Sequence, residues 1–279
     1  MGMYCIGDIH GCHAEFQALL QALDFSPSRD TLYVLGDLVN RGPDSAGVVR
    51  NLMALEGSAY CLLGNHDVHL LAVAAGARKP NPKDTLKPLL AAPDAPQMLD
   101  WLRRQPLALY ANQCLMVHAG VQPQWDVAQT LACAHEISQL LRAPDWAQHM
   151  AQLFGNLPDL WDDSLRGMER WRCSLNSLTR MRMMDRKGRI NFTHKLGSDA
   201  RAAREGLLPW FDVAGRRTAL TTVAFGHWST LGLLQRPHLL GLDTSCVWGG
   251  QLTAAEILHG GVPGRIVQVP RQPHAGLGG

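Results

Sequence analysis

The sequence predicts an α/β fold of alternating strands and helices, and three observations support this prediction. Apolar runs at 3–6, 31–36 and 60–63 have the length of buried strands. Each run leads into a polar turn with a glycine, and apolar residues at helical spacing follow each turn. Because the turns of such units gather at one edge of a sheet, we expect their polar side chains to lie close together.

The first turn, IGDIHG at 6–11, carries Asp8 and His10. These side chains face the same way because alternate residues of an extended chain share a face. A carboxylate and an imidazole in this arrangement form half of a divalent metal site. The turns at 36–43 and 64–67 follow the same plan, as do the ends of two later apolar runs at 114–117 and 222–225. Together the five turns present Asp8, His10, Asp37, Asn65, His66, His118 and His227.

The rest of the chain is organised around these turns. Residues 123–215 are the least strand-like part, and we predict a mainly helical cap inserted into the sheet domain. The whole chain, 1–279, is then one domain. Apolar runs at 222–225, 239–242, 251–258 and 265–269 are separated by Gly and Pro turns, which predicts an antiparallel second sheet packed on the first. The Pro- and Gly-rich end, 270–279, is expected to form a flexible tail.

The composition excludes several classes of protein. The formal net charge of +2 gives no global basic field of the kind that marks a non-specific nucleic-acid binder. The seven cysteines are scattered without a CxxC pair, which favours reduced core thiols in a reducing compartment. No stretch approaches the ~20 apolar residues of a membrane span, and no leader pattern begins the chain. We therefore expect a cytoplasmic protein with no membrane partner.

The mixture of imidazole and carboxylate groups indicates which metals would bind. Mn, Fe, Co and Zn accept such ligands, whereas a soft thiolate site would use cysteines. One carboxylate shared by two cations holds them ~3.5–4 Å apart, a spacing suited to phosphoryl displacement. Asp37 is the candidate for this shared ligand, because its turn is central and continues into Arg41.

The motifs GDIHG, GDLVNRG, GNHD, HAG and GHW resemble those of the calcineurin-like metallophosphoesterases. Further segments, among them LGNHDVHLLAVAAG, HAGVQPQWD, LTRMRM and LDTSCVWGGQLT, narrow the resemblance to the symmetrical bis(5′-nucleosyl)-tetraphosphatases, the bacterial diadenosine tetraphosphate hydrolases. The resemblance covers essentially the whole chain. It implies two packed mixed β-sheets flanked by helices, and two divalent metal ions, most simply Mn, with Co, Mg, Fe or Zn as alternatives.

Carried over residue by residue, the resemblance gives each motif side chain a role. It assigns Asp8, His10 and Asp37 to the first metal, and it assigns Asp37, Asn65, His118 and His227 to the second. His66 would be the general acid and Arg41 would bind phosphate. Protein phosphatases carry Asp where this chain has Asn40, and an amide cannot supply the negative charge that would raise the pKa of the His66 imidazole. This difference favours an anhydride substrate, whose leaving group is already good, and it leaves open what orients His66.

The implied reaction is symmetrical hydrolysis of diadenosine tetraphosphate to two ADP by a metal-activated water. Arg180 and Arg182 alternate in an apolar run and, if the run is extended, would present two guanidinium groups to the distal phosphates. A solvated strand edge explains them about as well. Trp228 and Trp248 follow or approach motif turns and are candidates for stacking on a base, although burial would also explain them.

The sequence leaves other functions open. A protein serine/threonine phosphatase would use the same chemistry. Removal of dinucleoside-polyphosphate caps from RNA 5′ ends is a further candidate, with capped RNA as a partner beside the free dinucleotide. A non-catalytic nucleotide sensor or scaffold is disfavoured, because all six proposed metal ligands are present.

Overall fold

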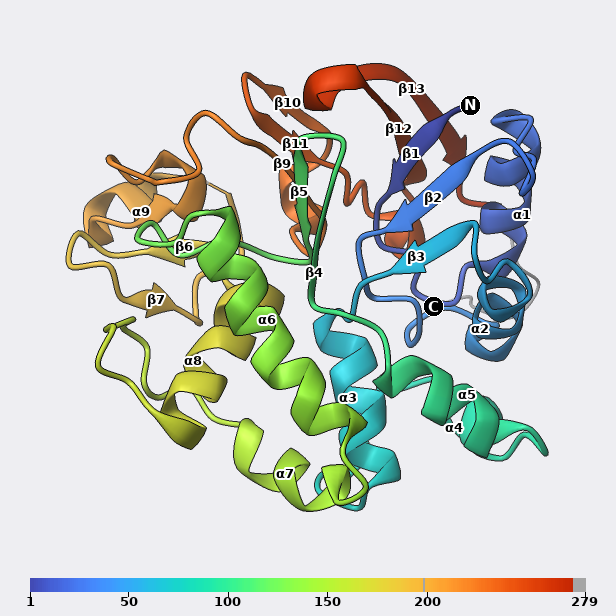
Figure 1. Cartoon of the computed structure of the whole chain (residues 1–279), viewed down its shortest axis with the longest axis horizontal. Coiled ribbons are helices and arrows are strands. Elements are labelled where there is room, and N and C mark those ends of the chain that lie inside the picture. Colours follow the sequence, from blue (N-terminus) through green and yellow to red (C-terminus); the bar gives the residue numbers. More distant parts are fainter. Residues whose placement is uncertain (198, 273–279) are drawn as a thin grey trace.

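The computed structural model describes residues 1–197 and 199–272, so the predicted tail lies outside the described residues from 273 onward. Two mixed β-sheets form its centre and helices flank them, which confirms the predicted fold class (Figure 1). Among the described residues, no helix combines the length and the hydrophobicity needed to cross a bilayer. All seven cysteines are buried and unpaired, as the scattered spacing predicted.

The first sheet has the order β13-β12-β1-β2-β3. Strands β1 (Met3–Ile6), β2 (Thr31–Val34) and β3 (Ala59–Cys61) run parallel. Strand β12 (Gln251–Leu258) pairs antiparallel with β1 and with β13 (Val262–Pro270). The three parallel strands are those predicted from the repeated strand, turn and helix pattern.

The second sheet has the order β10-β11-β9-β5-β4. Its strands are β4 (Ala108–Ala111), β5 (Cys114–Val117), β9 (Thr222–Phe225), β10 (Leu234–Arg236) and β11 (Leu239–Gly241). Strand β9 pairs parallel with both β5 and β11. The prediction of an antiparallel second sheet from the last four apolar runs was therefore wrong. Turn residues mark where strands end but not which sheet they join, and β12 and β13 complete the first sheet instead.

Alternation along β1 explains why the two sheets pack together. Tyr4 and Ile6 belong to the main apolar core, whereas Cys5, on the opposite face, packs with side chains of both sheets. That second cluster includes Met116 of β5 and Leu240 of β11. Burial of each such side chain stabilises the fold by about 1.5–3 kcal/mol, so the two sheets are held as one unit.

Helices cover the outer faces of the sheets (Figure 1). The first are α1 (His13–Ala22), α2 (Ser45–Ala54), α3 (Asn65–Ala74), α4 (Lys87–Leu90) and α5 (Ala95–Arg103). Asp44 caps α2 by accepting a hydrogen bond from the backbone N–H of Gly47 at 2.7 Å. Helix α3 begins directly at the third motif turn, so its first residues belong to the site.

The segment 123–215 is mainly helical and also contains a small sheet. Helices α6 (Val127–Arg142), α7 (Trp146–Leu153) and α8 (Gly167–Arg180) pack against one another, and α9 (Ala200–Glu205) follows. The small sheet has the order β7-β6-β8, formed by β6 (Met183–Met184), β7 (Ile190–Asn191) and β8 (Leu208–Pro209). Short 3₁₀ helices lie at Trp210–Asp212, Ser229–Leu231, Cys246–Trp248 and His259–Gly261.

Candidate metal centre and substrate cavity

Asp8 joins the turn after β1 to the turn after β9. Its two carboxylate oxygens accept hydrogen bonds from the backbone N–H of His227 at 3.0 and 3.1 Å. The side chain is buried, and burial raises the pKa of Asp8, with the nearby Asp243 carboxylate raising it further. Buried acidic groups that face one another favour a cation between them. Asp243 was missed in the sequence because it lies beyond the motif turns.

Asp37 lies at the centre of the gathered turns. Its Oδ1 accepts from the backbone N–H of His66 at 2.7 Å. Its Oδ2 lies 3.5 Å from Nε2 of His10 and 3.4 Å from Nε2 of His118. Burial opposes the charge, but the imidazoles of His118, His66 and His10 hold the pKa of Asp37 well below its usual range. The carboxylate is therefore ionised, and it lies close to the imidazoles of His10 and His118.

Hydrogen bonds orient the histidine rings toward Asp37. Nδ1 of His118 contacts the carbonyl of Leu35 at 2.8 Å, and Nδ1 of His10 contacts the carbonyl of Val39 at 3.4 Å. A carbonyl oxygen can only accept a hydrogen bond, so each Nδ1 carries a hydrogen and donates it. The other ring nitrogen, Nε2, then faces the carboxylates. Nε2 of His118 also lies 3.2 Å from Oδ1 of Asn65. Burial lowers the pKa of His118, but Asp37 and Asp8 outweigh it and raise this pKa to about 10, so this point attracts a positive charge.

Two groups of side chains have the geometry to hold a metal ion. One consists of His10, Asp37 and His66, and the other of Asp37, His118 and His227, with ligand atoms within 4.8 Å of one another. Asp37 belongs to both groups. Nε2 of His227 is buried without a hydrogen-bond partner among the described residues. An ionised carboxylate, oriented imidazoles and this unpartnered nitrogen fit a pair of divalent cations.

The backbone of the site is strained where the turns bend. Non-glycine residues rarely have positive φ, and such residues cluster at functional sites. Here five turn residues do so: His10 (50°), Asp37 (49°), Asn40 (75°), Arg41 (72°) and His227 (66°). Two glycines allow the close approach of the carboxylates. A Cβ on Gly226 would lie 2.0 Å from Oδ1 of Asp8, and one on Gly64 would lie 2.1 Å from Oδ1 of Asp37.

The structure shows what His66 contacts. Its Nδ1 lies 3.0 Å from Nδ2 of Asn40, and that amide contacts Oδ1 of Asp84 at 2.9 Å. Burial lowers the pKa of His66 to about 3. Asp67 points away, because its carboxylate accepts backbone N–H groups of Gly64, Leu38 and Val39. No sequence pattern indicated Asp84, which lies in a proline-rich stretch without a motif.

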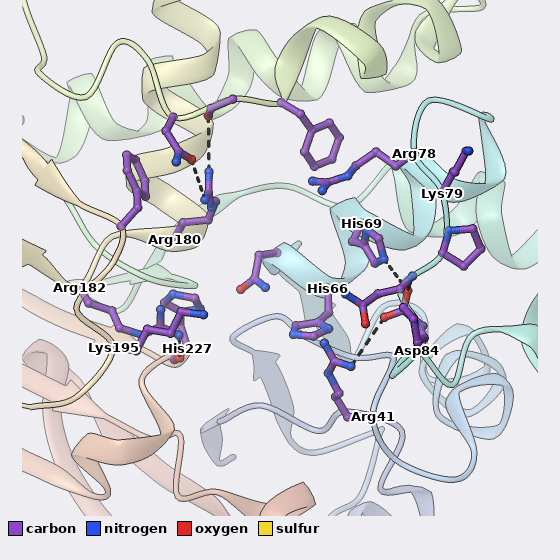
Figure 2. A pocket seen from close by; sticks show the side chains of 18 residues that line it. Arg41, His66, His69, Arg78, Lys79, Asp84, Arg180, Arg182, Lys195 and His227 are labelled. Carbon is purple, nitrogen blue, oxygen red and sulfur yellow. Dashed lines mark hydrogen bonds and ion pairs between the residues drawn. The ribbon is translucent and has the colours of Figure 1, made fainter.

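Beside these groups lies a cavity of about 910 Å³ (Figure 2). Asn65, His66 and His227 line it. Its other lining residues include six cationic side chains: Arg41, Arg78, Lys79, Arg180, Arg182 and Lys195. Such a surface suits a ligand with several negative charges. Arg78, Lys79 and Lys195 were missed in the sequence because they lie outside the motif turns and no spacing connects them.

Arg180 and Arg182 both line this cavity, but not through an extended run. Arg180 is the last residue of α8, and Arg182 precedes β6, so the extended run on which a shared face depended is not formed. Helix α8 continues because Trp171, Leu175 and Leu178 recur at the helical spacing i, i+4 and i+7 and pack in the core. Arg182 donates from Nη2 to the carbonyl of His227 at 2.9 Å, and Arg180 donates to Oδ1 of Asn176 at 2.8 Å. Burial lowers the pKa of both arginines.

The aromatic groups of the cavity are phenylalanines. Phe154 lies under the guanidinium of Arg78, and Phe192 lies under that of Arg180, each with 4.6 Å between Cζ and the ring centroid. The two tryptophans singled out in the sequence are not brought to this cavity. Trp228 is buried against Phe211, and Trp248 is 64% exposed elsewhere.

Comparisons with known proteins agree with this geometry. The calcineurin-like phosphoesterase family model matches residues 1–178. A protein of Acidovorax sp. (strain JS42) named symmetrical bis(5′-nucleosyl)-tetraphosphatase is 54% identical over 258 residues, which cover 91% of each chain. A protein of the same name from Nitrosomonas europaea is 43% identical and covers 98% of this chain and 100% of its own. A crystal structure described as a candidate diadenosine tetraphosphatase superposes with a TM-score of 0.65 at 29% identity, covering 98% of this chain and 95% of its own.

Proposed function

The chain belongs to the calcineurin-like phosphoesterase family, and we propose that it hydrolyses diadenosine tetraphosphate symmetrically to two ADP. One observation carries the proposal. The two groups of side chains that could hold a metal ion share Asp37, and they lie beside a large cavity lined with cationic side chains. The relatives named for this activity match nearly the whole chain, cap included.

Two divalent cations would be held in this centre. Asp8, His10 and Asp37 would ligate the first, and Asp37, Asn65, His118 and His227 would ligate the second. This nitrogen and oxygen set suits Mn, and Co, Mg, Fe or Zn are alternatives. When bound, the pair would supply Lewis-acid neutralisation of phosphate charge and lower the pKa of water.

The protein's own groups would bind and orient the phosphate chain. Nη1 of Arg41 donates to the carbonyl of Lys83 at 2.8 Å, which holds its guanidinium in the cavity. Arg182 is held beside His227 in the same way. Their remaining N–H groups would donate to the phosphate that is attacked, as preorganised electrostatic stabilisation. Arg180 lies across the cavity from Arg41 in Figure 2 and would bind a more distal phosphate.

The cavity would also accommodate the nucleosides. Phe154 and Phe192 offer aromatic faces on which adenine can stack. His66 would contact the leaving oxygen of the departing nucleoside diphosphate. Cleavage at the centre of the chain then requires that the cavity fix the distance from one base to the attacked phosphorus. We place this reaction in the cytoplasm, in accord with the seven unpaired cysteines.

Product analysis tests the proposal. Diadenosine tetraphosphate is incubated with the enzyme and each divalent metal in turn, and the nucleotides are separated by anion exchange. We expect ADP alone, whereas ATP together with AMP would contradict symmetrical cleavage. Asp37→Asn is expected to abolish turnover. The matched control is Asp162→Asn, which changes an exposed carboxylate that accepts from the backbone N–H of Ser164 in its own turn.

The rival substrates are tested in the same assay. A phosphoserine peptide and an RNA with a dinucleoside-tetraphosphate cap are offered beside the free dinucleotide. A higher kcat/KM for the peptide would replace the proposal with a protein phosphatase. Comparable kcat/KM for capped RNA would add that RNA as a second substrate of the same site.

A further inference from the structure

The amide of Asn40 has only one orientation that satisfies its neighbours. Its Oδ1 accepts from two backbone donors, the N–H of Arg41 at 2.8 Å and the N–H of Thr85 at 3.0 Å. Its Nδ2 lies 2.9 Å from Oδ1 of Asp84 and 3.0 Å from Nδ1 of His66. Exchanging the two ends would place an NH₂ against two N–H donors and an oxygen against a carboxylate. The NH₂ group therefore faces Asp84 and His66.

This orientation determines which nitrogen of His66 carries the proton. The two hydrogens of the Asn40 amide go to Asp84 and to Nδ1 of His66, so Nδ1 is an acceptor. The ring proton of His66 is then on Nε2, and the ring presents an N–H donor rather than a lone pair. His66 is thereby a hydrogen-bond donor in the site and not a metal ligand, although it lies close to His10 and Asp37.

The contacts of Asp84 fix its carboxylate where it holds Asn40 in this orientation. Its side chain is only 3% exposed. Oδ2 accepts from the backbone N–H of Asn81 and contacts Nε2 of His69, each at 2.7 Å, while Oδ1 accepts from Asn40. Asp84 comes from the stretch between α3 and α4 and touches none of the proposed metal ligands among the contacts described. Figure 2 shows it between His69 and Arg41, to the right of His66.

We propose that Asp84, acting through Asn40, is a positioning residue that fixes His66 as an Nε2–H donor and thereby selects phosphoanhydrides over phosphoesters. A neutral imidazole that gave up its proton would become an imidazolate, so His66 donates a hydrogen bond without transferring the proton. A nucleoside diphosphate leaves readily as an anion and needs no proton. The alkoxide of a phosphoester does need one. The selectivity rests on the proposed function, whereas the tautomer does not.

The tautomer is measured directly by ¹⁵N NMR of histidine-labelled enzyme loaded with diamagnetic Mg²⁺. The His66 signals are assigned by their loss in His66→Gln. We expect Nε2 of His66 to carry a directly bonded proton and Nδ1 to have the shift of an unprotonated acceptor. A proton on Nδ1 in the wild-type enzyme would overturn the proposal.

A reciprocal exchange of side chains tests the selectivity. In the double variant Asn40→Asp/Asp84→Asn, the new amide can donate to the new carboxylate and still accept from Asn81 and His69. The carboxylate at position 40 accepts from Nδ1–H of His66 and stabilises the imidazolium, in which Nε2 keeps a proton that it can transfer to the leaving oxygen. The single variant Asn40→Asp instead places two carboxylates in contact and is expected to lose stability. Because the exchange adds one carboxylate and removes another, the net charge of the double variant equals that of the wild type.

The readout is the ratio of kcat for phenyl phosphate, a phosphoester with a poor leaving group, to kcat for diadenosine tetraphosphate. We expect this ratio to rise about tenfold or more in the double variant, since general-acid catalysis typically contributes about 10²–10⁴-fold. An unchanged ratio in a folded double variant would overturn the selectivity. If the wild type fails to cleave the dinucleotide but shows the Nε2–H tautomer, the proposed function fails and the positioning role of Asp84 stands.

Discussion

The carboxylate of Asp8 accepts two hydrogen bonds from the backbone N–H of His227, which lies 219 positions further along the chain. Asp8 follows a strand of the first sheet, and His227 follows a strand of the second. The contact therefore forms only when both sheets are folded and packed. This contact helps to bring side chains that could bind a metal together at one site, although they lie far apart in the sequence.

Substitution of Gly226 tests this contact. In Gly226→Ala, the new Cβ would lie 2.0 Å from Oδ1 of Asp8 and must displace the carboxylate. We expect metal affinity to fall about tenfold or more, with a parallel loss of kcat, because a ligand and its supporting hydrogen bonds are moved together. Metal titration by calorimetry measures the change. Gly197→Ala is the control, since its new Cβ would meet no atom within 4 Å among the described residues other than its own chain neighbours; an affinity equal to the control's would contradict the role given to Asp8.

Arg180 and Arg182 are expected to act on substrate binding. Arg180→Gln removes a guanidinium that Asn176 holds at the cavity wall, and we expect KM for diadenosine tetraphosphate to rise about tenfold with little change in kcat. Arg182 lies next to the metal-type group that includes His227, so Arg182→Gln should lower kcat as well. Steady-state kinetics separates the two effects. Arg201→Gln, which removes an exposed cation of α9, should change neither KM nor kcat. If it changed them as much as Arg180→Gln does, the effect would come from the overall positive charge of the protein and not from specific contacts with the substrate.

Phe192 is expected to stack on a base. In Phe192→Leu, we predict that inhibition by ADP weakens about tenfold, because stacking of one base on an aromatic ring contributes about 1–3 kcal/mol. Phe192→Tyr keeps the ring and should keep the affinity. Inorganic tripolyphosphate has no base, so in Phe192→Leu its inhibition should weaken less than that of ADP, only through the lost contact between the ring and Arg180. If tripolyphosphate inhibition weakened as much as ADP inhibition, Phe192 would act on the phosphate site and not on the base.

Asp30 is expected to stabilise the first sheet in a pH-dependent way. Its carboxylate accepts from Arg29 and from the backbone N–H groups of Gly2 and Ser26, and these hydrogen bonds hold the pKa of Asp30 well below its usual range, with Arg29 the largest cause. A depressed pKa in the folded state gives stability that is present above the unfolded pKa, about 3.9, and is lost as the pH falls toward the folded value.

Asp30→Asn should therefore lower the free energy of unfolding by about 1 kcal/mol at pH 7. The difference from wild type should shrink below about pH 4, where the unfolded carboxyl binds a proton. Urea unfolding at a series of pH values measures it. Asp24→Asn is the matched control, because Asp24 also contacts Arg29 but its side chain is 94% exposed. A destabilisation that did not vary with pH would show that the carboxylate charge is not the cause.

The sequence was most informative where one residue type and its spacing determine the local structure. Buried strands followed by glycine-containing turns located Asp8, Asp37 and His118, because parallel strands place their turns at one edge. The pairing of β12 with β1 was not predictable, since turn residues set hairpins but tertiary packing decides which sheet a hairpin joins. Asp84 was missed for a related reason. Its contact with Asn40 spans 44 positions, between two loops that no periodic pattern connects.

Electron paramagnetic resonance of the enzyme loaded with Mn²⁺ measures whether Asp37 is shared by two adjacent cations. Cations held ~3.5–4 Å apart by a common carboxylate are magnetically coupled. We expect the signal of a spin-coupled pair in the wild type and its loss in Asp37→Asn. A spectrum of isolated, uncoupled Mn²⁺ in the fully loaded wild-type enzyme would contradict it.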